Sequence, residues 1–179
     1  MAQPPMLTHY QLLHSDVRPA LLRMFPQFQG RTPECMLLTI AGQETNLAYV
    51  YQMDSQGKPI QTLARGLWQF ELVGVEGCLN HPANGWLAPF LEQNGFAGLT
   101  PEMIHWALPA STSLATWLAR ANLWWYAEDL IEPIADYDHA EAAWQQYLDI
   151  WRPGKPHRET WDAHWLAAVE AVNISVDMV

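Results

Sequence analysis

A glutamate lies where a helix should present apolar side chains to the core. In the stretch TIAGQETNLAYVYQ, residues 39–52, helical spacing places Glu44 on one stripe with Leu37, Ile40 and Leu47. A carboxylate among such residues is unfavourable unless it is paired or protonated, and desolvation raises its pKa. A carboxyl group with a raised pKa suits general acid catalysis near neutral pH. The alternative is a Glu44 that is partly exposed at the helix end or that caps a neighbouring backbone.

The residues that follow Glu44 point to one group of enzymes. Thr45 comes next, then strand-forming residues, and then Gly66-Leu67-Trp68-Gln69. In this arrangement residues 33–75 resemble the lysozyme-like superfamily, especially soluble lytic transglycosylases and goose-type lysozymes. Those families commonly have Ser after the catalytic Glu and a later Gly-Leu-Met-Gln motif, so Thr replaces Ser and Trp replaces Met here.

The resemblance implies a role for each matched position. Glu44 would be the acid/base that protonates the glycosidic oxygen, and Thr45 would hydrogen-bond it or the sugar. Gln69 would contact the substrate or orient the acid, and Gly66 would let the backbone approach the ligand. The segment is also similar to family 19 chitinases, whose His-Glu-Thr and Gly-Arg-Gly elements correspond to residues 43–45 and 65–66.

The aromatic residues offer surfaces on which sugar rings could stack. Trp68 lies inside the matched motif and is the expected stacking residue, with Tyr49 and Tyr51 behind it. Six further tryptophans fall in helical patterns, where we expect the rings to fill the core: Trp117, Trp124, Trp144, Trp151, Trp161 and Trp165.

The type of cleavage depends on a second carboxylate. Most glycosidases use two carboxyl groups, about 5–5.5 Å apart when retaining and about 6.5–9.5 Å apart when inverting. The resemblance to lytic transglycosylases instead implies one acid/base and attack by the muramic 6-hydroxyl, which leaves an anhydro sugar. Asp54 has close to the spacing of phage-type lysozymes, with Thr62 where they place a later Thr, but Asp also favours turn initiation and would explain DSQG equally well. Glu71 should be exposed or ion-paired, because its offset from Gln69 points to another helix face.

Composition and charge exclude several functions. The 179 residues carry a formal net charge of −10 with nine Lys and Arg, which argues against nucleic acid and anionic lipid as partners. Neither a signal-peptide pattern nor an apolar run of the roughly 18 residues of a membrane span occurs. Histidines and acids at 136–139 and 157–164 lack a recognised metal spacing, so we expect no metal and no cofactor. Cys35 and Cys78 should be buried and reduced. The alternative, for a protein that works outside the cell, is a disulfide between them.

The elements that must position Glu44 can be read from periodicity. A helix is expected over residues 7–23, and a second from about 33 to 47, with Thr32 as N-cap and Pro33 at its first position. Residues 48–63 predict a small hairpin with a turn at DSQGKP. Apolar patterns resume at 64–79 and 85–95, and from Thr100 onward the pattern is helical, with RPGKP at 152–156 before the last helix.

Together these features predict a mostly α, lysozyme-like α+β fold, with a small β-hairpin lobe beside a helical lobe. We expect a single domain over residues 1–179, with a catalytic core at about 33–130 and a helical C-terminal extension at 131–179. The expected function is a glycoside hydrolase or lytic transglycosylase that cleaves the bond between N-acetylmuramic acid and N-acetylglucosamine in peptidoglycan strands. The chain would be made in the cytoplasm and reach the wall after lysis or delivery. The alternatives are a non-catalytic lysozyme-like module that binds glycan or the proteins of a virion or secretion assembly, and a chitinase-like hydrolase.

Overall fold

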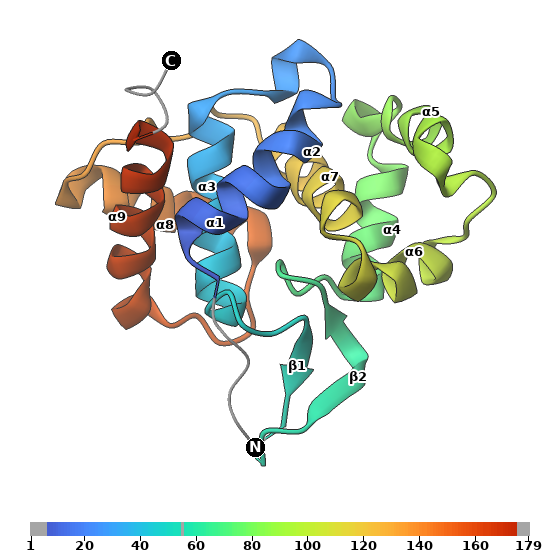
Figure 1. The fold of residues 1–179 in the computed structure, drawn as a ribbon, viewed down its shortest axis with the longest axis horizontal. Coiled ribbons are helices and arrows are strands. Elements are labelled where there is room, and N and C mark those ends of the chain that lie inside the picture. Colours follow the sequence, from blue (N-terminus) through green and yellow to red (C-terminus); the bar gives the residue numbers. More distant parts are fainter. Residues whose placement is uncertain (1–6, 55, 175–179) are drawn as a thin grey trace.

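The computed structural model describes residues 7–54 and 56–174, without the side chains of residues 61 and 62, as a helical body with one β-hairpin (Figure 1). The mostly α prediction with a small antiparallel β element is therefore confirmed. The helices are α1 (His9–Leu12), α2 (Arg18–Leu22), α3 (Arg31–Thr45), α4 (Leu72–Asn80), α5 (Leu87–Leu91), α6 (Pro101–Ala107), α7 (Thr112–Trp124), α8 (Tyr137–Trp151) and α9 (Arg158–Ile174). The strands are β1 (Tyr51–Met53) and β2 (Pro59–Arg65).

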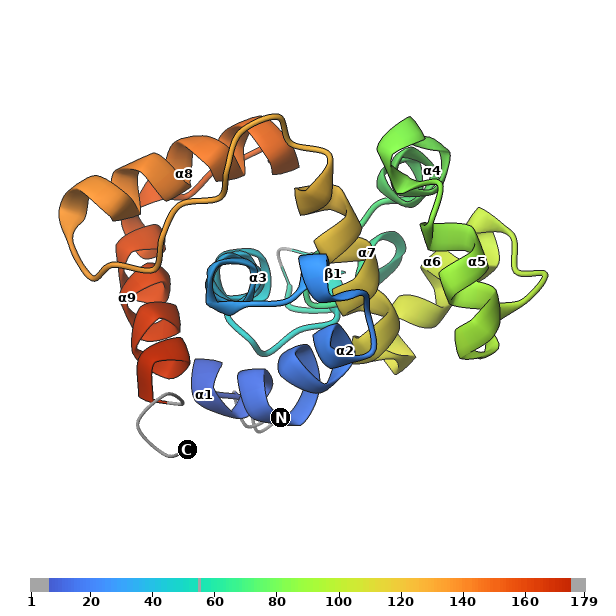
Figure 2. The same cartoon turned by 90° about the horizontal axis from the view of Figure 1, so that it is seen from above.

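Helix α3 is the centre of the helical body. Figure 2 shows it end-on, with α1, α2, α7, α8 and α9 around it. Its residues from Pro33 to Gly42 are all buried, which is expected of a helix that is surrounded on every side. The apolar stripe read from the sequence therefore describes only part of the buried surface of this helix.

The two ends of α3 differ slightly from the prediction. The helix begins at Arg31 after Gly30, whose φ is 120°, so Thr32 lies within the first turn and is not the N-cap. Pro33 still fits, because the first amides of a helix have no acceptor inside it. The helix ends at Thr45, since Asn46 and Leu47 take left-handed φ values of 50° and 55°. Glu44 therefore lies in the last turn.

The hairpin follows directly after α3 and projects from the helical body in Figure 1. Its antiparallel register pairs Gln52 with Ile60 and Met53 with Pro59, and an irregularity follows Tyr51. The Arg65 backbone also bridges to Phe70, which closes the chain between them into a tight turn. The 66–69 motif thus forms a connection between β2 and α4.

The C-terminal helices are part of the same body. Helix α9 packs along α3, and α8 packs against α9. The loop at 152–157 separates these two helices, as the RPGKP sequence predicts. In the described part of the chain no helix combines the length and apolar character that crossing a bilayer requires.

The core contains most of the residues expected there. Trp117, Trp144, Trp161 and Trp165 are buried, which confirms their packing role, whereas Trp124 is partly exposed and Trp151 is half-buried. Both cysteines are buried and unpaired, and burial raises the pKa of each thiol to about 12.

Candidate functional site

Glu44 is held by a tyrosine from a distant part of the chain. Its Oε1 accepts a hydrogen bond from the hydroxyl of Tyr147 in α8, at 2.7 Å. The Tyr147 ring is buried and stacks on Trp161, with ring centroids 4.9 Å apart, and it also contacts Trp144 at 5.2 Å. Because the ring is packed on two sides, the direction of its hydroxyl is fixed toward the carboxyl group.

The surroundings of this pair raise the pKa of Glu44. Burial raises the pKa of Glu44, and the hydrogen bond from Tyr147 opposes part of that rise. Burial and the nearby Glu44 raise the pKa of Tyr147 even further from the neutral range, so the tyrosine remains a hydroxyl donor. No Lys or Arg of the described residues forms an ion pair with Glu44. The pair can therefore hold and release a proton on the carboxyl group.

Trp68 does not form a sugar-stacking surface, and that prediction is wrong. The side chain is 0% exposed, and its indole N–H donates to the backbone carbonyl of Leu37 in α3 at 2.9 Å. Its own carbonyl accepts a hydrogen bond from the indole of Trp151 at 3.1 Å. Trp68 therefore fastens the β2–α4 connection to α3 and α8 and has no face left for a ligand.

Three other matched residues also serve the local fold. The Thr45 hydroxyl is buried and donates to the carbonyl of Ala41 at 2.7 Å, and not to Glu44 or toward solvent. Gly66 is buried with φ 73°, and a Cβ there would lie 3.3 Å from the Cβ of Leu108. Its glycine is thus required by backbone conformation and packing, not by a ligand that approaches the backbone. Gln69 has φ 49° and donates its amide to the Gly66 carbonyl at 2.9 Å, which closes the turn.

Asp54 forms the hairpin turn. Its Oδ1 accepts hydrogen bonds from the backbone N–H groups of Gln56 and Lys58, both at 2.8 Å. This geometry agrees with the turn-forming interpretation, and no hydrogen bond links Asp54 to Glu44 in the described part of the chain. Tyr49 and Tyr51 are half-buried at the start of the hairpin, and the Thr62 side chain lies outside the described residues. Glu71 is exposed just before α4, as expected.

A cavity of about 510 Å³ lies among β2, α4 and α6. Trp106 forms part of its wall and is 60% exposed, and the guanidinium of Arg65 covers its ring at 3.4 Å. His105 is buried beside it, with Nε2 2.9 Å from the Phe70 carbonyl. Three carboxylates complete the polar part of the wall: Glu71, Glu76 and Glu102. Exposed aromatic rings can stack on sugar rings, and neighbouring carboxylates can accept hydrogen bonds from the sugar hydroxyl groups.

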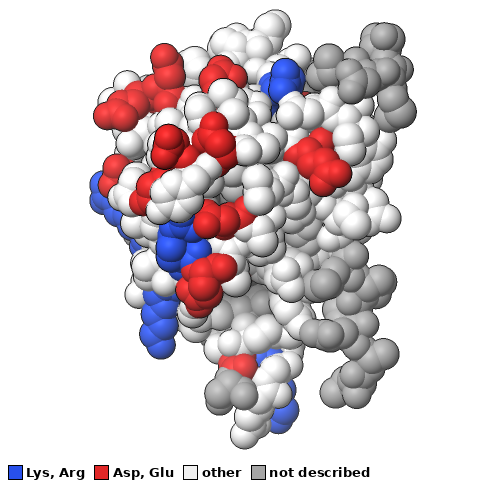
Figure 3. Space-filling view, turned by 90° about the vertical axis from the view of Figure 1, so that its left-hand side faces the viewer, with Lys and Arg blue, Asp and Glu red and all other residues white. Residues whose placement is uncertain are grey.

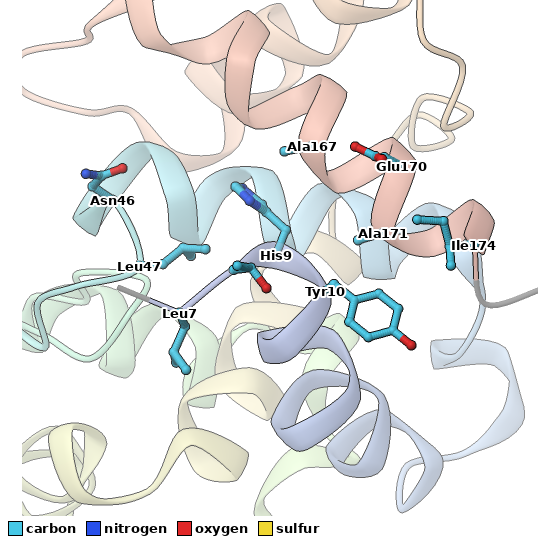
Figure 4. A pocket seen from close by; sticks show the side chains of 10 residues that line it. Leu7, His9, Tyr10, Asn46, Leu47, Ala167, Glu170, Ala171 and Ile174 are labelled. Carbon is cyan, nitrogen blue, oxygen red and sulfur yellow. The ribbon is translucent and has the colours of Figure 1, made fainter. Parts of the chain in front are cut away.

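A second cavity, of about 490 Å³, lies between α1 and α9 (Figure 4). Its wall is mainly apolar and includes Leu7, Leu47 and Ile174. His9 also borders it and faces His164 across Gly42, with the two rings 5.4 Å apart. Burial, followed by the effect of His164, lowers the pKa of His9 to about 4. Glu44 lines neither of the two cavities.

Sequence reasoning missed Tyr147 and Trp106. Tyr147 is separated from Glu44 by 103 positions and lies in the helical pattern WQQYLDIW, which gives no sign of a polar contact. Trp106 has the same helical context as the tryptophans of the core. Both became visible only through their neighbours in space. No cluster of three or more potential metal-ligating side chains occurs among the described residues.

Comparison with models of known protein families, with curated protein sequences and with solved structures gave no match.

Proposed function

We propose that the protein is a peptidoglycan-cleaving glycosidase, a muramidase or lytic transglycosylase, with Glu44 as general acid/base. It would act on the β-1,4 bond between N-acetylmuramic acid and N-acetylglucosamine. The observation that carries the proposal is a half-buried carboxyl group whose pKa is raised and whose partner is a neutral hydroxyl. Such a group can carry the proton that a glycosidic oxygen needs as its bond breaks.

A second glutamate on the same helix gives an internal comparison. Glu34 is buried, whereas Glu44 is half-buried, and the guanidinium of Arg18 binds the two oxygens of Glu34 at 2.8 and 2.6 Å. That arrangement compensates the buried charge and is what a structural carboxylate requires. Glu44 has no such cation, so its partial burial lowers the stability of the fold. A purely structural role would not explain why a carboxyl group is present there. This contrast favours a chemical role for Glu44.

The proposed reaction uses the pair in two steps. Protonated Glu44 gives its proton to the glycosidic oxygen while the bond to the sugar carbon breaks, and the carboxylate that forms gains a stronger hydrogen bond from Tyr147. Water or the muramic 6-hydroxyl then attacks the sugar carbon and returns a proton to Glu44. Because Asp54 is engaged in its own turn, we favour the route that uses a single acid and the 6-hydroxyl.

The glycan would extend over an open surface, since a long polymer does not require an enclosed cavity. Trp106 replaces Trp68 as the proposed stacking residue, because its ring is exposed and lies beside carboxylates. A chitinase-like hydrolase would use the same chemistry on chains without lactyl groups. The net charge of −10 provides no electrostatic attraction to an anionic wall. It therefore favours a second candidate, a non-catalytic module that binds glycan or delivery-system proteins.

The test is mass spectrometry of the fragments released from purified peptidoglycan by the wild type, Glu44→Gln and Glu92→Gln. The amide introduced by Glu44→Gln can still accept the Tyr147 hydrogen bond, so the fold should persist. Glu92 is the control, because it is exposed and lines neither of the two cavities. Fragments with 1,6-anhydro ends that vanish only in Glu44→Gln would support a transglycosylase, and reducing ends would support a hydrolase. If the wild type leaves both peptidoglycan and chitin oligomers intact, the enzyme proposal fails and the binding module takes its place.

A further inference from the structure

Positive charge is concentrated in one short connection of an otherwise acidic chain. Three of the nine Lys and Arg residues, Arg152, Lys155 and Arg158, lie within the seven positions 152–158, although the net charge is −10. This segment comprises the α8–α9 loop, residues 152–157, and the first residue of α9. Figure 3 shows most of the basic side chains of the viewed face in its lower part and most of the acidic ones above them.

Both ends of the α8–α9 loop are fixed next to Glu44. At its start, Trp151 follows Tyr147 by one helical turn and donates its indole N–H to the Trp68 carbonyl at 3.1 Å. At its end, the His157 carbonyl accepts the side-chain amide of Gln43 at 2.8 Å. Gln43 directly precedes Glu44, and its Oε1 also accepts the hydroxyl of Thr160 at 3.0 Å. The loop therefore spans from the Tyr147 side of the carboxyl group to the residue before it.

The basic residues of this segment are not equivalent. Arg158 is engaged by Glu141 at 2.9 Å and by Asp162 at 2.6 Å. Arg152 and Lys155 are exposed, and neither forms an ion pair with a carboxylate of the described residues. Arg152 has φ 48°, and its Nε–H donates to the Asp149 carbonyl at 3.2 Å, which restrains the side chain as far as the guanidinium. Two accessible cations thus lie on the loop whose ends are held by Gln43, the residue before Glu44, and by Trp151, one turn after Tyr147.

We infer that Arg152 and Lys155 bind the carboxylates of the peptide stems carried by the muramic acid residues next to the cleaved bond. This inference rests on the proposed function. The stem is attached through the lactyl group of that sugar and carries free carboxylates, so it leaves the glycan within reach of a loop beside the acid. Guanidinium and ammonium groups form charge-assisted hydrogen bonds with carboxylates. The loop would make the enzyme prefer glycan that still has its stems, despite the acidic charge of the whole protein.

The experiment compares three substrates with the same glycan chain. They are peptidoglycan with intact stems, the same material after chemical amidation of its carboxylates, and chains from which the stems have been removed. The loop variants are Arg152→Asn, chosen because Asn tolerates a left-handed backbone, and Lys155→Gln, alone and together. The control is Arg23→Gln combined with Arg31→Gln, which removes the same charge from the region of α2 and the start of α3.

The wild type should cleave intact-stem material about three- to tenfold more efficiently, by kcat/KM, than either of the other substrates. One exposed charge pair changes an equilibrium by about 1.5- to 5-fold, and two are involved. The double loop variant should lose this preference and keep its rate on stem-free chains, and raising the salt concentration should reduce the preference. The control should behave as the wild type does.

A preference that is absent in the wild type, or unchanged in the double loop variant, would overturn the inference and leave the proposed cleavage intact. A binding assay also distinguishes stem recognition from the proposed cleavage. Glu44→Gln should co-sediment with intact-stem peptidoglycan and less with amidated material, and this difference should disappear when the loop changes are added. If that binding difference is found while the wild type cleaves nothing, stem recognition stands and the catalytic proposal fails.

Discussion

Replacement of Tyr147 by Phe tests the pair at the centre of the site. The change removes the hydroxyl that donates to Glu44 at 2.7 Å and keeps the ring on Trp161. That hydrogen bond lowers the pKa of Glu44 against the effect of burial, so its loss should raise the pKa further. A hydrogen bond to a charged group contributes about 1.5–3 kcal/mol, and one pKa unit corresponds to about 1.4 kcal/mol. The expected rise is therefore roughly one to two units.

Two assays measure this rise. In protein with ¹³C-labelled glutamate carboxyl groups, NMR titration reports the pKa directly, and the signal missing from Glu44→Gln assigns it. The general acid must be protonated, so the alkaline limb of the pH dependence of kcat/KM should move to higher pH by the same amount. The maximal rate should fall roughly tenfold or more, because the carboxylate formed in the reaction loses its donor.

Tyr126→Phe is the matched control for this experiment. Tyr126 also donates to a carboxylate, Asp149 at 3.3 Å, but on the exposed surface and away from Glu44. Its replacement should leave both the titration of Glu44 and the pH profile unchanged. An unchanged or lowered pKa of Glu44 in Tyr147→Phe would refute the reasoning that the hydroxyl stabilises the charged carboxylate.

Other contacts lead to predictions on stability and binding. Burial and a neighbouring histidine lower the pKa of His9 to about 4, so its contribution to stability is complete above its unfolded value of about 6.5 and is lost as pH falls toward 4. Urea unfolding of His9→Gln should vary less with pH across this range. Gly66→Ala should lower the free energy of unfolding by about 1–3 kcal/mol, because φ is 73° and the new Cβ would lie 3.3 Å from its nearest neighbour. Gly57→Ala, at φ 72° with nothing within 4 Å, measures the backbone penalty alone. Trp106→Ala should weaken binding of glycan chains about three- to tenfold, whereas Trp124→Ala should not.

The helices were predictable because their signals are local. Thr100 accepts a hydrogen bond from the Met103 N–H as the N-cap of α6, and the Pro and Gly residues at 152–156 separate the last two helices. The start of α3 was misplaced by two residues, because Gly30 and Thr32 both fit the position before a Pro-containing first turn. The burial of α3 on every side was not readable from one amphipathic stripe, since it depends on which helices come to surround it.

The sequence predicted only those parts of the site that depend on a single helix or turn. The apolar stripe singled out Glu44, which is half-buried in the last turn of α3, as the alternative of a partly exposed helix end describes, and whose pKa is nevertheless raised by burial. The DSQG sequence explained Asp54 as a turn residue. Trp68 was assigned to the ligand because its motif resembles a substrate-binding element. Its position instead depends on a bond to the Leu37 carbonyl, which no pattern around residue 68 encodes.

The resemblance at residues 33–75 therefore covers only half of the proposed site. The hydroxyl that fixes Glu44, the Trp151 indole that holds the turn after β2, and the basic loop all come from residues 137–157. Without them Glu44 would be a carboxylate at the end of a helix, with water in place of Tyr147 and little reason for a raised pKa. What makes Glu44 a candidate acid is thus the position of α8, which brings Tyr147 to the end of α3, together with the packing of α9 along α3. The hydrogen bonds of Tyr147 to Glu44 and of Gln43 to the His157 carbonyl link the chemistry of the site to the stability of the C-terminal helices.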